Sequence, residues 1–231
     1  MAHKQPGYRF ENDWEPEMSI SDAKYVAMGI ALPIYEEIRV NNTVLNLDSV
    51  KHYLEKARKI SVMDCPCRTK RKHCDAPLDT CLMLDDMAEF SETEKFRGSH
   101  AKSHVHNLTV EEALKVVEKA HTAGLVPMAY MRTDTPKPEG VNFICNCCSC
   151  CCSIFGLTLR FGMAPHILKS VATTLTDESK CTSCGVCVDR CHFGARKIVN
   201  GKMGYNKDLC FGCGLCVDTC PTESIKLIQL T

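Results

Sequence analysis

The residue type with the clearest chemistry in this sequence is cysteine, whose thiolate binds soft metals or forms disulfides. The 231 residues include 18 cysteines at short, repeated spacings. Neighbours such as Cys147 and Cys148 cannot easily bridge each other, and disulfide frameworks belong to short secreted chains. The start of the chain has no apolar stretch typical of a secretory signal. We therefore expect metal-binding cysteines in a reducing compartment, the cytoplasm.

The last eight cysteines form one pattern that occurs twice. The spacing Cys-x2-Cys-x2-Cys-x3-Cys is found in residues 180–191 and again, 29 residues later, in residues 209–220. Such a repeat predicts a pseudo-two-fold unit. Gly185 and Gly214 recur within it, and they allow a tight turn whose N–H groups are free to point at sulfur.

This pattern, over about 60 residues, resembles the bacterial ferredoxin with two [4Fe–4S] clusters. The resemblance implies a (βαβ)2 ferredoxin-like domain over residues 172–231. It also implies crossed ligands, because the fourth cysteine of each run binds the cluster of the other run. Zinc is the alternative, but zinc sites use fewer cysteines and seldom have this spacing. The implied ligands are Cys181, Cys184, Cys187 and Cys220 for one cluster, and Cys210, Cys213, Cys216 and Cys191 for the other.

The first run departs from this family at His192, where the pattern has proline. A histidine beside a ligand adds an ionisable group, which would let the potential of that cluster rise as the pH falls. The simpler interpretation is a tolerated surface residue. On that interpretation, replacing His192 by proline leaves the cluster content intact.

The other ten cysteines have a less familiar spacing. They lie in residues 65–81, which begin with the stretch CPCR, and in residues 145–152, which include most of the stretch ICNCC. This arrangement resembles a group of 4Fe–4S-binding proteins of anaerobes that carry a Cys-rich N-terminal domain ahead of a ferredoxin tail. The resemblance implies an anaerobic source but no specific activity. The ten residues are Cys65, Cys67, Cys74, Cys81, Cys145, Cys147, Cys148, Cys150, Cys151 and Cys152.

Residues 145–152 suit a ridge between two metal sites, because neighbours in an extended segment point to opposite sides. Residues 65–81 would supply the remaining ligands, which predicts one or two further iron–sulfur clusters. Two cubanes would use eight of the ten thiols. An atypical cluster with more than four cysteines stays open, as do non-cubane clusters with five thiolates each, although their Cys-Cys-Gly signature is absent. A further alternative is zinc on the first four cysteines, with His73 or Asp75 as substitute ligands.

Two groups of polar residues flank these cysteines. A basic run would offset cluster charge and raise the reduction potential, dock an acidic partner, or simply form a solvated face. Three histidines could bind metal, although a polar loop is the expected role of residues 91–107. The basic run is Arg68, Lys70, Arg71, Lys72 and His73, and the histidines are His100, His104 and His106.

The apolar pattern predicts an α+β protein. Residues 1–171 are expected to form a helical Cys-rich domain with a small β-hairpin at 125–145, ahead of the ferredoxin domain. Thr109 and Glu112 form a capping box, and Asp48 is the expected N-cap of an earlier helix. The expected helices are Ser19–Arg39, Asn46–Lys59, Leu82–Phe90, Thr109–Ala123 and 150–162, and the expected strands are Ile60–Met63, Leu125–Met131 and Val141–Cys145.

The net charge and the absence of certain motifs exclude several classes of function. The formal net charge is zero, which argues against nucleic-acid binding. No apolar run is long enough to span a membrane, and no dinucleotide or Walker motif is present. We expect a multi-cluster electron-transfer protein that passes low-potential electrons between redox protein partners, as an oxidoreductase subunit or a soluble carrier. Alternatives are a reductase with an atypical N-terminal cluster fed by the ferredoxin tail, and a redox-sensing regulator with a winged-helix-like domain.

Overall fold

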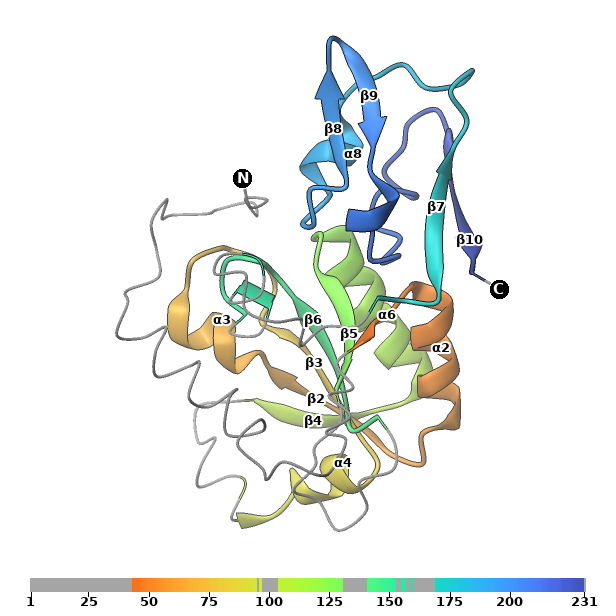
Figure 1. The fold of residues 1–231 in the computed structure, drawn as a ribbon. Coiled ribbons are helices and arrows are strands. Elements are labelled where there is room, and N and C mark those ends of the chain that lie inside the picture. Colours follow the sequence, from red (N-terminus) through yellow and green to blue (C-terminus); the bar gives the residue numbers. More distant parts are fainter. Residues whose placement is uncertain are drawn as a thin grey trace, which may run out of the picture.

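The computed structural model describes residues 43–94, 96, 104–130, 141–152, 155–156, 159 and 169–230. Helices and strands both contribute, so the chain is an α+β protein (Figure 1). Several expectations lie outside the described residues: the helix at 19–39, the middle of the hairpin at 125–145, most of the helix at 150–162, and His100. Within the described residues, no helix combines the length and apolar character needed to cross a membrane.

The cysteine-rich part contains an antiparallel sheet of six strands in the order β1-β5-β6-β3-β2-β4. The predicted hairpin is present as the pair β5 and β6, but further strands pair on both sides of it. The prediction of a helical domain with only a small hairpin is therefore wrong. The strands are β1 (Thr43–Val44), β2 (Ile60–Asp64), β3 (Asp79–Leu84), β4 (Val105–Leu108), β5 (Val126–Tyr130) and β6 (Phe143–Cys147).

Strand β3 corrects the helix expected over Leu82–Phe90. Its residues are buried almost throughout, and a continuous apolar run does not distinguish a buried strand from a buried helix. The strand ends before Asp85, whose φ of 50° breaks the regular backbone, and only then does helix α4 (Asp86–Phe90) begin. Strand β4 is a half-exposed edge strand, so its polar residues resembled a loop.

Two helices cover one face of the sheet. Helix α2 (Leu47–Lys56) and helix α6 (Val110–Thr122) bury Leu54 and Val117 against Leu82 and other strand residues. The capping box predicted at the start of α6 is confirmed. The N-cap of α2 is Asn46 and not Asp48, since the Asn46 side chain accepts a hydrogen bond from the Ser49 N–H at 2.9 Å.

The opposite face of the sheet carries cysteines. Side chains alternate along a strand, so Leu82 faces the helices whereas Cys81 faces away from them. The register pairs Leu82 with Ile144, which places Cys81 opposite Cys145 on the neighbouring strand. Helix α3 (Pro66–Arg71) begins directly after β2, with Cys65 as its N-cap. The sheet thus separates an ordinary apolar core from a face rich in thiols.

The C-terminal part consists of two small antiparallel sheets, β7 with β10 and β8 with β9. Gly212 is essential to the packing of a cysteine loop against β7. It has a φ of +70°, and an added Cβ would lie 2.1 Å from the Ala172 carbonyl oxygen. The elements are β7 (Ala172–Thr176), α8 (Val186–Asp189), β8 (Arg196–Val199), β9 (Lys202–Tyr205), the 3-10 helix η1 (Lys207–Leu209) and β10 (Ile225–Gln229).

His192 joins the two parts of the chain. Its Nε2 donates to the Gly124 carbonyl at 2.7 Å, and its Nδ1 lies 3.2 Å from the Ser149 hydroxyl. The Phe155 ring packs beside it, with centroids 5.4 Å apart. His192 is only 4% exposed, so the expectation of a tolerated surface residue is wrong. It serves the contact at the end of α6, where the C-terminal part lies in Figure 1.

Arg190, which precedes His192 at the end of α8, strengthens the same contact. Its guanidinium donates to the carbonyl of His121 at 2.7 Å and to the carbonyl of Thr122 at 3.2 Å. These oxygens belong to the last turn of α6, where helical carbonyls lack partners of their own. The C-terminal part therefore caps α6 through two neighbouring side chains.

Replacing His192 by alanine should destabilise the contact between the parts. The change removes the hydrogen bond from Nε2 to the buried Gly124 carbonyl and opens space beside Phe155, so we expect a loss of about 1–3 kcal/mol. Denaturant unfolding of the metal-loaded protein measures this loss. The control is His52→Ala at an exposed position of α2, expected to change stability by less than about 0.5 kcal/mol. Equal effects of the two variants would contradict the assigned role of His192.

Candidate metal centres

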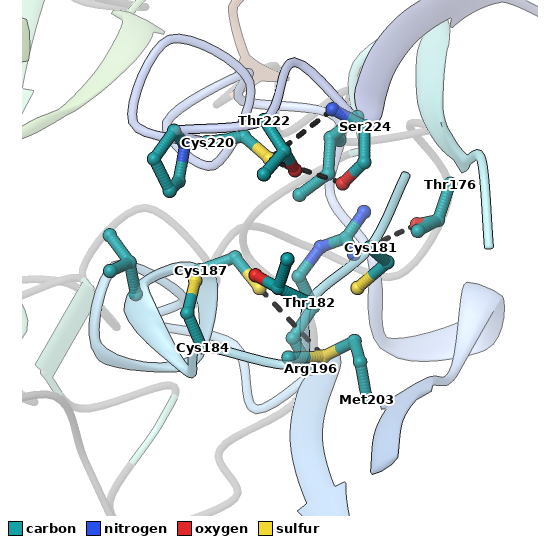
Figure 2. A pocket seen from close by; sticks show the side chains of 13 residues that line it. Thr176, Cys181, Thr182, Cys184, Cys187, Arg196, Met203, Cys220, Thr222 and Ser224 are labelled. Atoms are coloured by element: carbon teal, nitrogen blue, oxygen red, sulfur yellow. Dashed lines mark hydrogen bonds between the residues drawn. The ribbon is translucent and has the colours of Figure 1, made fainter. Parts of the chain in front are cut away.

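The C-terminal cysteines line two hollows. Both hollows open to solvent, and the space within their linings, solvent included, is about 300 Å³ for the first and about 330 Å³ for the second. Each is lined by three cysteines from one run and the fourth cysteine of the other run, as Figure 2 shows for the first. The first hollow is lined by Cys181, Cys184, Cys187 and Cys220, and the second by Cys191, Cys210, Cys213 and Cys216. Gly185 and Gly214 have φ angles of 83° and 82°, so the expected glycine turns are present.

Hydrogen-bond donors surround the thiol that enters the first hollow from the second run. The Cys220 sulfur accepts from the Ser224 N–H at 3.3 Å and lies 3.1 Å from the Ser224 hydroxyl. Burial raises the pKa of this thiol, but hydrogen bonds from Ser224 and Thr222 outweigh burial and lower the pKa to about 7. The protein thus favours the thiolate form, the form that binds metal.

The deeper thiols of the second hollow behave differently. Burial raises the pKa of Cys213, and burial raises that of Cys216 to about 11 although Arg196 opposes the shift. Without a cation in the hollow these two thiols hold their protons at neutral pH. Half-buried thiols that line one hollow in this way are suited to a metal centre, whose positive charge replaces the protons.

Arg196 lines both hollows and was not foreseen from the sequence. It is 2% exposed, and its guanidinium donates to the hydroxyls of Thr176 at 3.0 Å and Thr174 at 2.8 Å. The guanidinium also lies 4.6 Å from the centre of the Tyr205 ring. A permanent positive charge is therefore fixed between two groups of cysteines. The sequence repeat does mark this position as a difference between the two halves, because the residue 29 positions after Arg196 is the apolar Ile225.

The ten remaining cysteines divide into two groups. In the first, the ligand sulfurs all lie within 4.8 Å of one another. We call it the four-thiol group, and it consists of Cys74, Cys148, Cys150 and Cys151. Cys74 comes from the loop after α3, and the other three come from the turn that follows β6.

The other six thiols lie along a closed ring in which each thiol shifts the pKa of the next. Cys81 and Cys145 lie opposite each other on β3 and β6, and Cys147 follows on the same face of β6. Interaction with Cys145 raises the pKa of Cys81 well above its usual range, whereas interaction with Cys147 lowers the pKa of Cys145, so the thiols of the ring share protons where no cation is bound. We call it the six-thiol ring, and its order is Cys65, Cys67, Cys152, Cys147, Cys145, Cys81 and back to Cys65.

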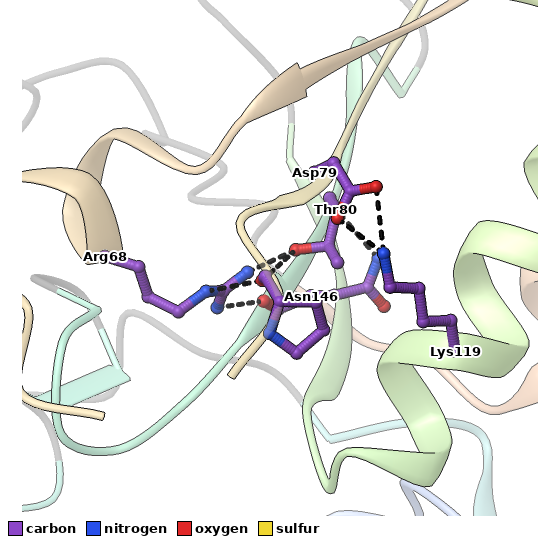
Figure 3. A network of polar contacts seen from close by, with 6 residues as sticks. Arg68, Asp79, Thr80, Lys119 and Asn146 are labelled. Carbon is purple, nitrogen blue, oxygen red and sulfur yellow. Dashed lines mark hydrogen bonds and ion pairs between the residues drawn. The ribbon is translucent and has the colours of Figure 1, made fainter. Parts of the chain in front are cut away.

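Arg68 is the centre of a polar network between the two groups (Figure 3). Its Nε donates to the Pro77 carbonyl at 3.0 Å, and its Nη1 donates to the Asn146 carbonyl at 2.8 Å and reaches the Cys148 sulfur at 4.0 Å. Its Nη2 also donates to the Thr80 hydroxyl. Burial lowers the pKa of Arg68, but the surrounding thiols raise it further, so the side chain is always charged.

The basic run has two faces. Arg68, Arg71 and His73 are buried, and Arg71 donates to the Cys151 carbonyl at 2.7 Å. Lys70 and Lys72 are exposed. The prediction of positive charge beside the cysteines is thus confirmed for the arginines, whereas the lysines form a solvated face.

The histidine metal site, which was the less favoured alternative to a polar loop, does not form among the described residues. The His104 ring lies 2.9 Å from the Asp64 carboxylate and is 91% exposed, and His106 is an exposed residue of the edge strand β4. Ser149 and Asn146 were missed from the sequence, because a serine or an asparagine between cysteines gives no signal of a long-range contact.

Residues 180–225 match a family model described as a 4Fe-4S dicluster domain. No curated protein matches the chain. The family match supports 4Fe–4S binding by a ferredoxin-like C-terminal region, and it ends at the strand that closes the small sheet with β7.

Arg68 can be tested against its exposed neighbour. Arg68→Met removes the donor of the Asn146 carbonyl, leaves the Pro77 carbonyl with only the long contact from the Thr80 hydroxyl at 3.5 Å, and removes the charge beside Cys148. Each unsatisfied buried group costs about 1–3 kcal/mol, so we expect clear destabilisation and a lower metal content in the cysteine-rich part. Lys70→Met, on the exposed side of the same helix, should change neither the stability nor the metal content. Thermal unfolding and metal analysis of both purified variants test this prediction, and equal results for the two variants would contradict it.

Proposed function

We propose that this chain is an iron–sulfur electron-transfer protein with a [4Fe–4S] cluster in each hollow of the C-terminal part. The observation that carries the proposal is that each hollow is lined by four cysteines drawn from both runs. Four thiolates are the ligand set of a cubane, and the crossed origin of the fourth is that of a two-cluster ferredoxin. When bound, such clusters accept and release single electrons.

The residues of the chain have distinct tasks in this proposal. The eight cysteines hold the clusters, with the crossed division described above. Ser224 and Thr222 donate hydrogen bonds toward Cys220, which favours electron-rich sulfur and raises the reduction potential. Arg196 supplies positive charge to both hollows. The domain boundary near residue 171 and the (βαβ)2 arrangement of residues 172–231 belong to the same proposal.

The cysteine-rich part, residues 1–171, supplies further metal centres built from its ten thiols. Redox proteins are the partners we propose, as donor and acceptor, in the cytoplasm of an anaerobe. The link from Ser149 to His192 brings the four-thiol group beside Cys191, a proposed ligand in the second hollow. The two parts therefore meet through residues that are chain neighbours of metal-binding cysteines on both sides, an arrangement suited to passing electrons between them.

A reductase is the second candidate, and the six-thiol ring favours it. Six thiols exceed the four that a cubane needs, so a centre of unusual composition fits the ring. An iron atom without a protein ligand would bind small molecules, and a shift of one iron signal on adding cyanide would reveal it. A winged-helix regulator is not proposed, because the hairpin β5–β6 lies inside the sheet and is not a free wing.

Iron and sulfide analysis tests the proposal on the anaerobically purified full chain. The C-terminal part alone accounts for about eight irons and about eight sulfides per chain, in two cubanes. Cys220→Ser should perturb the same electron paramagnetic resonance signal as Cys184→Ser, and Cys191→Ser should perturb the other signal. Pairing of Cys220 with the signal that depends on Cys213 would contradict the crossed division, and fewer than about eight irons would contradict the two clusters.

Arg196→Met should lower the reduction potential of both clusters. A nearby positive charge stabilises the reduced, more negative cluster, so its removal makes reduction harder. Redox titration followed by electron paramagnetic resonance measures both potentials in one sample. Arg196→Lys retains most of the effect, and Lys197→Met, at the exposed neighbour on β8, leaves both potentials almost unchanged. A shift confined to one cluster would contradict a charge shared by the two hollows.

A further inference from the structure

The four-thiol group is far more compact than the other cysteine sites. The Cys74 sulfur lies 3.9 Å from that of Cys148 and 3.8 Å from that of Cys151. The sulfurs of Cys150 and Cys151 are 3.9 Å apart. All four side chains are buried. These sulfurs surround a point and leave little space between them.

Such spacing is what one tetrahedral ion requires. Four thiolates placed about 2.3 Å from a central ion lie about 3.8 Å from one another. A cubane keeps its four thiolates farther apart, because four irons and four sulfides lie between them. The separations in the four-thiol group agree with the single ion.

The chain itself provides the comparison. The ferredoxin-like cysteines line two hollows that open to solvent, and no three of their sulfurs lie within 4.8 Å of one another. Among the residues that the structure describes, no other three or more cysteine, histidine or acidic side chains converge within 4.8 Å. The six-thiol ring does not meet this limit either, so its open arrangement is suited to a larger centre. The four-thiol group is thus a different kind of site from every other cysteine group in the described chain.

The side chains around the four-thiol group would compensate the negative charge of a bound metal ion with its four thiolates. A divalent ion with four thiolates carries a net charge of about −2, which is costly to bury without compensation. Arg68 points Nη1 at the Cys148 sulfur from 4.0 Å, and Arg71 holds the Cys151 carbonyl. His73 lies 3.0 Å from the Cys150 carbonyl and fixes the backbone of the same turn. Two buried cations and a buried histidine therefore orient and balance the ligands, as partners around metal sites do.

We propose that the four-thiol group binds a single tetrahedral metal ion, zinc or iron, and is not an iron–sulfur cluster site. The ligands are deprotonated as they bind, so loading releases protons. This site goes beyond the electron-transfer proposal, since its ion fastens the loop after α3 to the turn after β6. Ser149 lies inside that turn and contacts His192, so the ion also stabilises the surface on which the C-terminal part packs.

Metal and sulfide counts on two variants of the full chain test this site. Cys150→Ser should remove about one metal ion per chain and leave acid-labile sulfide unchanged, because a mononuclear site contains no sulfide. Cys67→Ser, in the six-thiol ring, should leave that ion in place. Loss of about four irons together with sulfide from Cys150→Ser would overturn the proposal, since that is the loss of a cubane.

X-ray absorption on the unaltered protein supplies a test that does not depend on a variant folding. We expect four sulfur ligands at about 2.3 Å around zinc, with no metal neighbour. If the ion is iron, the sample shows iron in excess of sulfide and the high-spin ferric signal of a mononuclear centre after oxidation. Absence of zinc together with iron fully matched by sulfide overturns the proposal. The cluster signals of the C-terminal part are read in the same sample, so failure of the proposed function is seen separately.

Discussion

The structure depends on the electrostatics of many thiols buried close together. Neighbouring buried thiolates repel one another, and each also loses its hydration, so they cannot all ionise without cations among them. The chain supplies some of that positive charge itself, through Arg68 beside the four-thiol group and Arg196 between the two hollows. In the proposals made above, bound metal supplies the rest. The fold is best understood as a set of elements that hold the sulfurs close enough for metal and place fixed cations behind them.

The six-stranded sheet performs this task in the cysteine-rich part. Side chains alternate along each strand, so one face can be an apolar core under α2 and α6 while the other carries thiols. Pairing of β3 with β6 brings Cys81 beside Cys145 although they are far apart in sequence. The turn after β6 then carries three further cysteines to Cys74. A sheet is rigid because its hydrogen bonds are shared between strands, and it holds sulfurs more accurately than loops alone would.

The contact between the two parts explains the departure of the first cysteine run from its pattern. Proline at position 192 would satisfy the local turn, but it has no side-chain donor for the Gly124 carbonyl. His192 provides that donor and packs against Phe155, while Phe193 stacks on Phe211 with ring centroids 4.2 Å apart. The residue thus reflects the docking of the C-terminal part and not the needs of the cluster loop. A local pattern cannot show this, because its partners lie in other segments of the chain.

The sequence by itself determined the features that depend on residues close together along the chain. The repeated cysteine runs, the glycine turns at 185 and 214, the capping box at Thr109 and the hairpin from 125 to 145 follow from nearest neighbours along the chain. Only the tertiary structure decided that β3 is a strand, that His192 is buried, that Arg196 faces both hollows, and that ten cysteines divide into four and six. The physical reason is that these features arise from strand pairing and from packing between distant segments, and both bring together residues whose separation in sequence carries no information about their distance in space.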